Sequence, residues 1–120
     1  MNELEQWIAA KNKALVNFVR QVRIDTVTHI RLATPVDTNQ ARSNWQLGGS
    51  VSQTPLVGKI TVDDDAAEKA NLVPFYEKFY IINNLPYIIA LERGWSAQAP
   101  QGMVKITVEL MQAKINSKKL

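Results

Sequence analysis

Residues 3–33 read ELEQWIAAKNKALVNFVRQVRIDTVTHIRLA, a run of the chain without a single proline or glycine. Apolar side chains recur along it at the spacing of one helix face. That face carries Leu4, Ile8, Leu15, Val19 and Val22, and it is widened by Trp7 and Phe18. The pattern predicts one long helix with Trp7 in the core. β-Branched residues crowd positions 24–30 and lower the helix propensity, which leaves room for a kink before Pro35 stops the helix.

Short elements follow this helix, because turn residues and alternation replace the helical pattern. Asp37 or Thr38 can cap a single helical turn over Gln40–Arg42. Alternation then predicts a strand over about Asn44–Ser52, which the pair Gly48–Gly49 can interrupt with a bulge or a turn.

The middle of the chain alternates between β-type and helical patterns. Residues 57–62 form a short β-type run, and the acidic triplet Asp63–Asp65 can cap a helix over Ala66–Leu72. Phe79–Asn83 is aromatic and β-branched, which predicts the clearest strand of the chain.

Pro86 can begin a further short helix, which Gly94 ends as the first residue beyond the cap. Its inward side chains are expected to be Tyr87, Ala90 and Leu91. Glu92 and Arg93 are expected to point outward. Within the motif Glu92 can order the loop that follows, by accepting hydrogen bonds from backbone N–H groups of residues 94–98, or it can pair with another subunit.

The last helix is predicted from Gln101 or Gly102 to about Ser117, and its apolar positions spread beyond one face. A lone chain could not bury all of them on its own sheet. We therefore expect Leu110 and Met111 to contribute to packing against another chain. The lysines that follow this stripe are expected to face solvent; they are Lys114, Lys118 and Lys119.

The order of elements defines the fold class as α+β, with a small, mostly antiparallel sheet packed against a long N-terminal helix and a C-terminal helix. A length of 120 residues predicts one domain over 1–120. Cysteine is absent, which excludes disulfides and thiolate chemistry. The first residues resemble no signal peptide, and no apolar run approaches the length that crosses a bilayer. A net charge of +3 is mildly basic and fits a solvated surface.

The chain offers little for catalysis, so neither a catalytic residue nor a cofactor nor a metal is expected. His29 is the single histidine and has no partner at helical spacing for a metal. Ser96 does not stand in a Gly-x-Ser-x-Gly turn. Asp63–Asp65 lacks the alternating spacing and glycine of a calcium loop. A hydrolase would have to depend on Ser96, Glu92 or His29, and we regard this class as disfavoured.

Proline, glycine and aromatic residues gather in two segments, 83–87 (NNLPY) and 90–104 (ALERGWSAQAPQGMV). A third segment upstream reads TPVDT over residues 34–38 and is followed by ARSNW over 41–45. Taken in chain order, the three segments resemble the tail-completion or head–tail joining proteins of tailed bacteriophages, which are small proteins of the phage neck. The similarity spans roughly residues 34–108 and is weak between Gly48 and Val73. The family usually has glycine after the Asp-Thr pair, where this chain has Asn39.

The resemblance implies a structural virion protein that is assembled in the host cytoplasm and incorporated in the virion. Copies would form a ring, of six in the family, that completes the tail and joins it to the head while DNA passes through. Its partners would be other copies and other neck and tail proteins, with non-specific contact with DNA left open and no membrane involved. A tail-terminator or connector ring is the alternative within this class. A monomeric protein-binding module is the alternative from another class.

The residues of the resembling motifs are candidates for the subunit and partner interface. Trp45 is also expected to be a core residue. Trp95 has two candidate roles, a position in the core of its own chain or an anchor between subunits. With the two apolar positions of the last helix, the candidates are Asp37, Thr38, Arg42, Trp45, Asn84, Pro86, Tyr87, Glu92, Gly94, Trp95, Ser96, Gln98, Pro100, Gly102, Leu110 and Met111.

Overall fold

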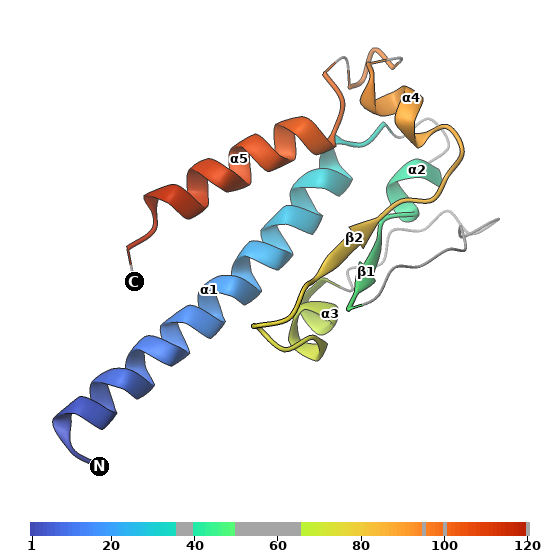
Figure 1. Cartoon of the computed structure of the whole chain (residues 1–120). Helices are drawn as coiled ribbons and strands as arrows, with labels where there is room; N and C mark the ends of the chain where they lie inside the picture. The colour runs from blue at the N-terminus through green and yellow to red at the C-terminus, as the bar shows by residue number, and fades with distance from the viewer. Residues whose placement is uncertain (36–39, 50–65, 95, 100, 120) are drawn as a thin grey trace.

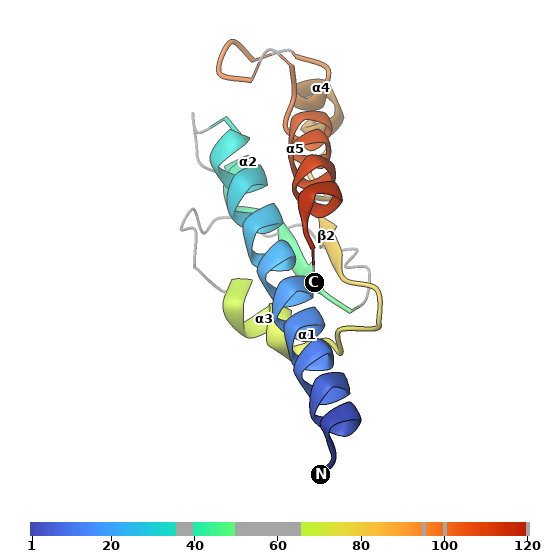
Figure 2. The same ribbon diagram turned by 90° about the vertical axis from the view of Figure 1, so that its left-hand side faces the viewer.

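The computed structural model describes residues 1–35, 40–49, 66–94, 96–99 and 101–119, and its fold is α+β (Figure 1). The elements in chain order are α1 (Glu3–Ala33), α2 (Gln40–Ser43), β1 (Gln46–Gly48), α3 (Ala66–Leu72), β2 (Tyr80–Ile82), α4 (Ile88–Glu92) and α5 (Val104–Ser117). Helix α1 runs along most of the molecule, with α5 along one side and the strands and α3 along the other, and α4 lies beyond its C-terminal end (Figures 1 and 2). The molecule is therefore elongated, measuring 57 × 27 × 19 Å.

Helix α1 is one unbroken helix over the predicted residues, so the β-branched stretch does not interrupt it. Asn2 caps its start, because the Asn2 side chain accepts a hydrogen bond from the Glu5 N–H at 2.8 Å. Thr34 ends it: the Thr34 N–H donates to the Arg31 carbonyl, and the Thr34 hydroxyl donates to the Ile30 carbonyl at 2.6 Å. The proline that follows then prevents continuation.

The two halves of α1 differ in burial. Every residue from 1 to 13 is exposed, whereas Arg23, Val27 and Ile30 of the second half are buried. Trp7 is 59% exposed, so the prediction that it packs in the core is wrong. Periodicity reports that a helix face is apolar, but it does not report whether another element of the same chain reaches that face.

The core lies where the second half of α1 meets the strands and the start of α5. Its buried centre consists of Ile30, Trp45, Ala99 and Met103. Partly buried apolar residues surround it; they are Ala33, Ile81, Ile88 and Leu91. Trp45 is thus confirmed as a core residue, and its indole N–H donates to the Thr34 hydroxyl at 2.8 Å, which satisfies the one polar atom of its ring.

The sheet is a two-stranded antiparallel pair, with Gln46 opposite Ile82 and Gly48 opposite Tyr80. Both strands are shorter than the sequence predicts, although each lies inside its predicted range. The helical turn near residue 40 and the helix at Ala66–Leu72 are confirmed. The predicted run 57–62, the acidic triplet 63–65 and the end of the first predicted strand (50–52) lie outside the described residues.

A single arginine of α1 attaches the segment that joins α3 to β2. The Arg23 guanidinium donates four hydrogen bonds of 2.6–3.1 Å to backbone carbonyls, those of Ala70, Val73, Pro74 and Glu77. Its plane also lies over the Phe79 ring, 4.9 Å from the centroid. These carbonyls lie at the end of a helix and in the following turn, beyond the reach of helical N–H groups, and Arg23 supplies donors to them. The Pro74 carbonyl also accepts from the Glu77 N–H at 3.0 Å.

Replacing Arg23 with methionine should lower the free energy of unfolding by about 3 kcal/mol, because a bond from a charged donor contributes about 1.5–3 kcal/mol and water can replace only some of the four. Urea denaturation monitored by circular dichroism would measure the change. Lys13→Met, on the exposed half of the same helix, is the control and should change stability by less than about 0.5 kcal/mol. Equal effects of the two substitutions would contradict the role of Arg23.

Candidate interaction surface

The junction between α4 and α5 is organised by the Glu92 carboxylate. Oε1 accepts from the Met103 and Val104 N–H groups at 2.7 Å each, and Oε2 accepts from the Lys105 N–H at 3.0 Å. The first turn of a helix leaves its N–H groups without partners and carries partial positive charge, so a carboxylate stabilises it in two ways. Glu92 is therefore the cap of α5, supplied from another helix.

The ordering role predicted for Glu92 holds, but its donors are the start of α5 rather than residues 94–98. The prediction that Glu92 points outward is wrong for the same reason. It ends α4, and the chain returns past that end to begin α5, so the carboxylate lies against the N-terminus of the next helix.

Gly102 permits this approach. Its φ is +81°, and a Cβ added there would lie 2.3 Å from the Glu92 carbonyl oxygen and 2.7 Å from the Glu92 carboxylate carbon. No side chain other than hydrogen fits at that distance. Gly94, with φ +89°, confirms its predicted place beyond the end of α4, and its N–H donates to the Leu91 carbonyl at 3.1 Å.

Among the described residues between these glycines, 96–99 and 101, backbone hydrogen bonds form turns. The Ala99 N–H donates to the Ser96 carbonyl at 3.1 Å, and the Gly102 N–H donates to the Ala99 carbonyl at 3.0 Å. The Ser96 hydroxyl accepts from the Gln98 N–H at 3.2 Å. Contacts within the chain thus account for the concentration of glycine here, and a role in contact with a partner stays a prediction.

Two opposing effects set the pKa of Glu92. Partial burial raises it, and the three backbone N–H donors of Val104, Met103 and Lys105 lower it. The donors prevail, and the pKa of Glu92 is held below its ordinary value. The carboxylate is therefore ionised at neutral pH.

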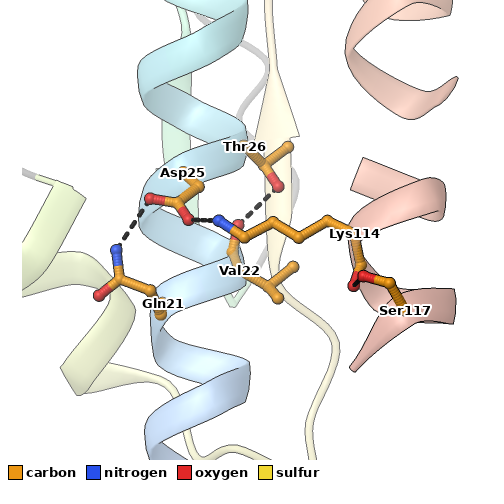
Figure 3. A network of polar contacts seen from close by, with 6 residues as sticks. All are labelled: Gln21, Val22, Asp25, Thr26, Lys114 and Ser117. Carbon is orange, nitrogen blue, oxygen red and sulfur yellow. Dashed lines mark hydrogen bonds and ion pairs between the residues drawn. The ribbon is translucent and has the colours of Figure 1, made fainter. Parts of the chain in front are cut away.

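Helix α5 packs antiparallel along the second half of α1, through contacts spaced along both helices. His29 Nδ1 and the Thr107 hydroxyl are 2.7 Å apart, Asp25 pairs with Lys114, and the Lys118 ammonium lies 5.6 Å from the centroid of the Phe18 ring. Figure 3 shows Asp25 between Lys114 and Gln21, whose amide donates to it at 2.8 Å. Asp25 consequently has a lowered pKa, chiefly from the Lys114 hydrogen bond and despite partial burial.

Lys114 was expected only to face solvent. It is exposed, but it pairs with Asp25 and so takes part in the packing of the two helices. Beyond this contact α5 ends, and the two helices leave a groove of about 420 Å³ between them. Its walls are mostly apolar and consist of Leu15, Phe18, Val19, Val22, Ile115 and the stems of Arg23 and Lys118.

The candidate interface residues do not form one patch. Trp45 and Gly102 are buried inside the chain, and Arg42 donates to the Leu32 and Thr34 carbonyls at 3.3 and 3.4 Å. Pro86 and Tyr87 are exposed, so the inward orientation predicted for Tyr87 is wrong. Leu110 is 48% exposed and Met111 only 8%. Asn84 is half-buried and Gln98 is exposed. Asp37, Thr38, Trp95 and Pro100 lie outside the described residues.

The structure exposes two apolar helix faces, of which only Val104 lies within the sequence motifs. One lies on the first half of α1 and carries Leu4, Trp7, Ile8 and Leu15; we call it the α1 face. The other runs along α5 beside the side that contacts α1 and carries the exposed Val104, Val108 and Ile115, of which Ile115 also lines the groove; we call it the α5 face. The signal for the first was present in the sequence, in the apolar stripe, but it was assigned to the core.

The potential catalytic groups have structural partners. His29 contacts Thr107, and both oxygens of Glu92 accept bonds from the α5 backbone. Among the residues that the structure describes, no group of three or more His, Cys, Asp or Glu could hold a metal ion. No helix within those same ranges has both the length and the apolar character needed to cross a membrane.

Comparisons with known proteins give no match to this chain, whether against family models, curated proteins or solved structures.

Gly102→Ala should lower the free energy of unfolding by about 2 kcal/mol or more, because it combines a positive φ with a clash against backbone. Gly49→Ala is the matched control: a Cβ there would meet only the Val73 side chain, at an ordinary 3.5 Å. Thermal melting of both variants measures the difference. A Gly102→Ala protein as stable as Gly49→Ala would show that the junction does not need this close approach.

The wild type should be more stable than Glu92→Gln by about 1–2 kcal/mol at neutral pH, through the ionised cap. A carboxylate whose pKa is lowered by folding contributes stability above its unfolded pKa, near 4.5, and loses it as pH falls through the folded value. In that window the unfolded chain binds a proton that the folded chain does not, so stability rises with pH. Urea denaturation across a pH series should show the difference constant above about pH 4.5 and shrinking below. A difference independent of pH would contradict the ionised cap.

Proposed function

We propose that this chain is a structural protein of a tailed-phage neck, whose copies form a ring, of six as in the family it resembles, that completes the tail and joins it to the head. DNA would pass through the ring, and the protein would carry out assembly without chemical turnover. A tail-terminator or connector ring is the alternative position within the same neck.

The observation that carries the proposal is the pair of exposed apolar faces, together with the sequence motifs at 34–45 and 83–104, which occur in the same order as in the family that the chain resembles. A small chain that leaves Leu4, Trp7, Ile8, Val108 and Ile115 in water has surface suited to burial against other chains. A closed ring needs a heterologous interface, in which two different patches of one subunit meet. The α1 face and the α5 face lie on different helices and so supply two such patches.

The charge of the chain fits this role without requiring DNA binding. The net charge is +3, and of the three C-terminal lysines, Lys114 is paired with Asp25 and Lys118 lies over Phe18. A ring that lets DNA slide through has no need of strong phosphate contacts, which would retard it. Contact with passing DNA is therefore weak or absent in this proposal.

The purified protein should form oligomers in micromolar solution and should attach to phage tails that lack their head-proximal end. Analytical ultracentrifugation measures the first, and co-sedimentation with such tails, followed by head attachment, measures the second. A chain that stays monomeric and does not bind tails, yet captures one soluble protein, would instead be the binding module.

A further inference from the structure

We propose that the α1 face of one copy packs against the α5 face of a second copy, as an antiparallel pair of helices. This inference rests on the proposed function for ring closure, and it names the surfaces that join the subunits. The α1 face is therefore covered by a second copy of this chain and not by another protein.

The first argument is that the α1 face continues a surface that already binds an α5 helix. Helix α5 covers α1 from His29 back to Phe18 and ends there, at Ser117. The apolar stripe does not end with it, because Leu15, Ile8 and Leu4 follow on the same side of α1 at spacings of 7 and 4 residues. A second α5 helix would continue the cover of this stripe, using its α5 face where the first uses the side of Thr107 and Met111.

The second argument is that the two faces match in length and pattern. The α1 face places Leu4, Ile8 and Leu15 at spacings of 4 and 7 residues, and the α5 face places Val104, Val108 and Ile115 at the same spacings. Each set therefore spans about 16 Å at 1.5 Å per residue. Spacings of 4 and 7 are those of the apolar seam of paired helices, so both faces can take part in such a seam. In an antiparallel pair the two patterns run in opposite directions, with Leu4 near Ile115 and Leu15 near Val104.

Charge selects the antiparallel arrangement. The first turn of α1 carries Glu3 and Glu5. The end of α5 and the residues beyond it are basic, with the exposed Lys118 and Lys119. Antiparallel packing brings the acidic end of one helix to the basic end of the other, and it places the positive end of the α1 dipole beside the negative end of the α5 dipole.

The interface is tested with two charge substitutions, Ile8→Glu on the α1 face and Val108→Glu on the α5 face. Both side chains are exposed in the single chain, at 44% and 57%, so each variant should fold and melt like the wild type. Each alone should weaken self-association about 30-fold or more, as a buried interface anchor does. Leu72→Glu is the control, because Leu72 is an apolar side chain of α3 that is 68% exposed and belongs to neither face. It should associate like the wild type.

Mixing the two variants distinguishes the proposed interface from the alternatives. An Ile8→Glu copy keeps its α5 face and a Val108→Glu copy keeps its α1 face, so the mixture should form one-to-one dimers and nothing larger. If Val108→Glu alone associates like the wild type, the α1 faces pair with each other and the proposal is wrong. A wild type that stays monomeric throughout the micromolar range also overturns it, whereas binding to phage tails would leave the proposed function standing.

The orientation is tested by cross-linking, which the absence of cysteine from the chain makes unambiguous. Glu5→Cys in one copy should form an intermolecular disulfide with Asn116→Cys in another, in preference to Lys105→Cys at the opposite end of α5. All three positions are exposed. Preferential cross-linking to Lys105→Cys would overturn the antiparallel arrangement.

Discussion

The capping of α5 by Glu92 is the interaction on which the arrangement of the helices depends. One carboxylate accepts three N–H groups of the first turn, and it can do so only because Gly102 lets the backbone pass at contact distance. The cap fixes where α5 begins, at the end of α1 that lies beside the core. Met103, the residue before α5, is then fully buried, and α5 can only run back along α1 toward its N-terminus.

The lengths of the two helices determine what remains uncovered. Helix α1 has 31 residues and α5 has 14, which at 1.5 Å per residue gives lengths of about 46 and 21 Å. Because α5 starts beside the end of α1, it cannot reach the first half. On the opposite side, Arg23 holds the α3–β2 segment to the middle of α1 through four carbonyls. Residues 1–13 are consequently all exposed, although the apolar stripe of α1 runs through them.

The sequence predicted the elements better than their partners. Local signals were sufficient for α1, the turn near residue 40, α3, α4 with Gly94, and the strand near Tyr80, since helix periodicity, turn residues and β-branching act over a few residues. The partners of Glu92 and the exposure of Trp7 could not be read in the same way. Each depends on which distant segment returns to that place, and the sequence contains no local record of it. Arg23 is the clearest case, because an arginine in an amphipathic helix is usually a solvated charge and here it binds four buried or half-buried carbonyls.

The contacts at the α4–α5 junction change which surface is the candidate for binding another chain. The glycine- and proline-rich segment around residues 94–103 belongs to the motifs that predict an interface, yet its glycines serve the α4–α5 junction: Gly94 ends one helix and Gly102 admits the cap of the next. A segment constrained in this way can be essential to assembly without touching a partner, since it sets the direction of α5. If α5 pointed in another direction, the stripe of Val104, Val108 and Ile115 would take another position relative to α1. The motif residues and the exposed helix faces are then two parts of one arrangement, in which the first holds the second in position.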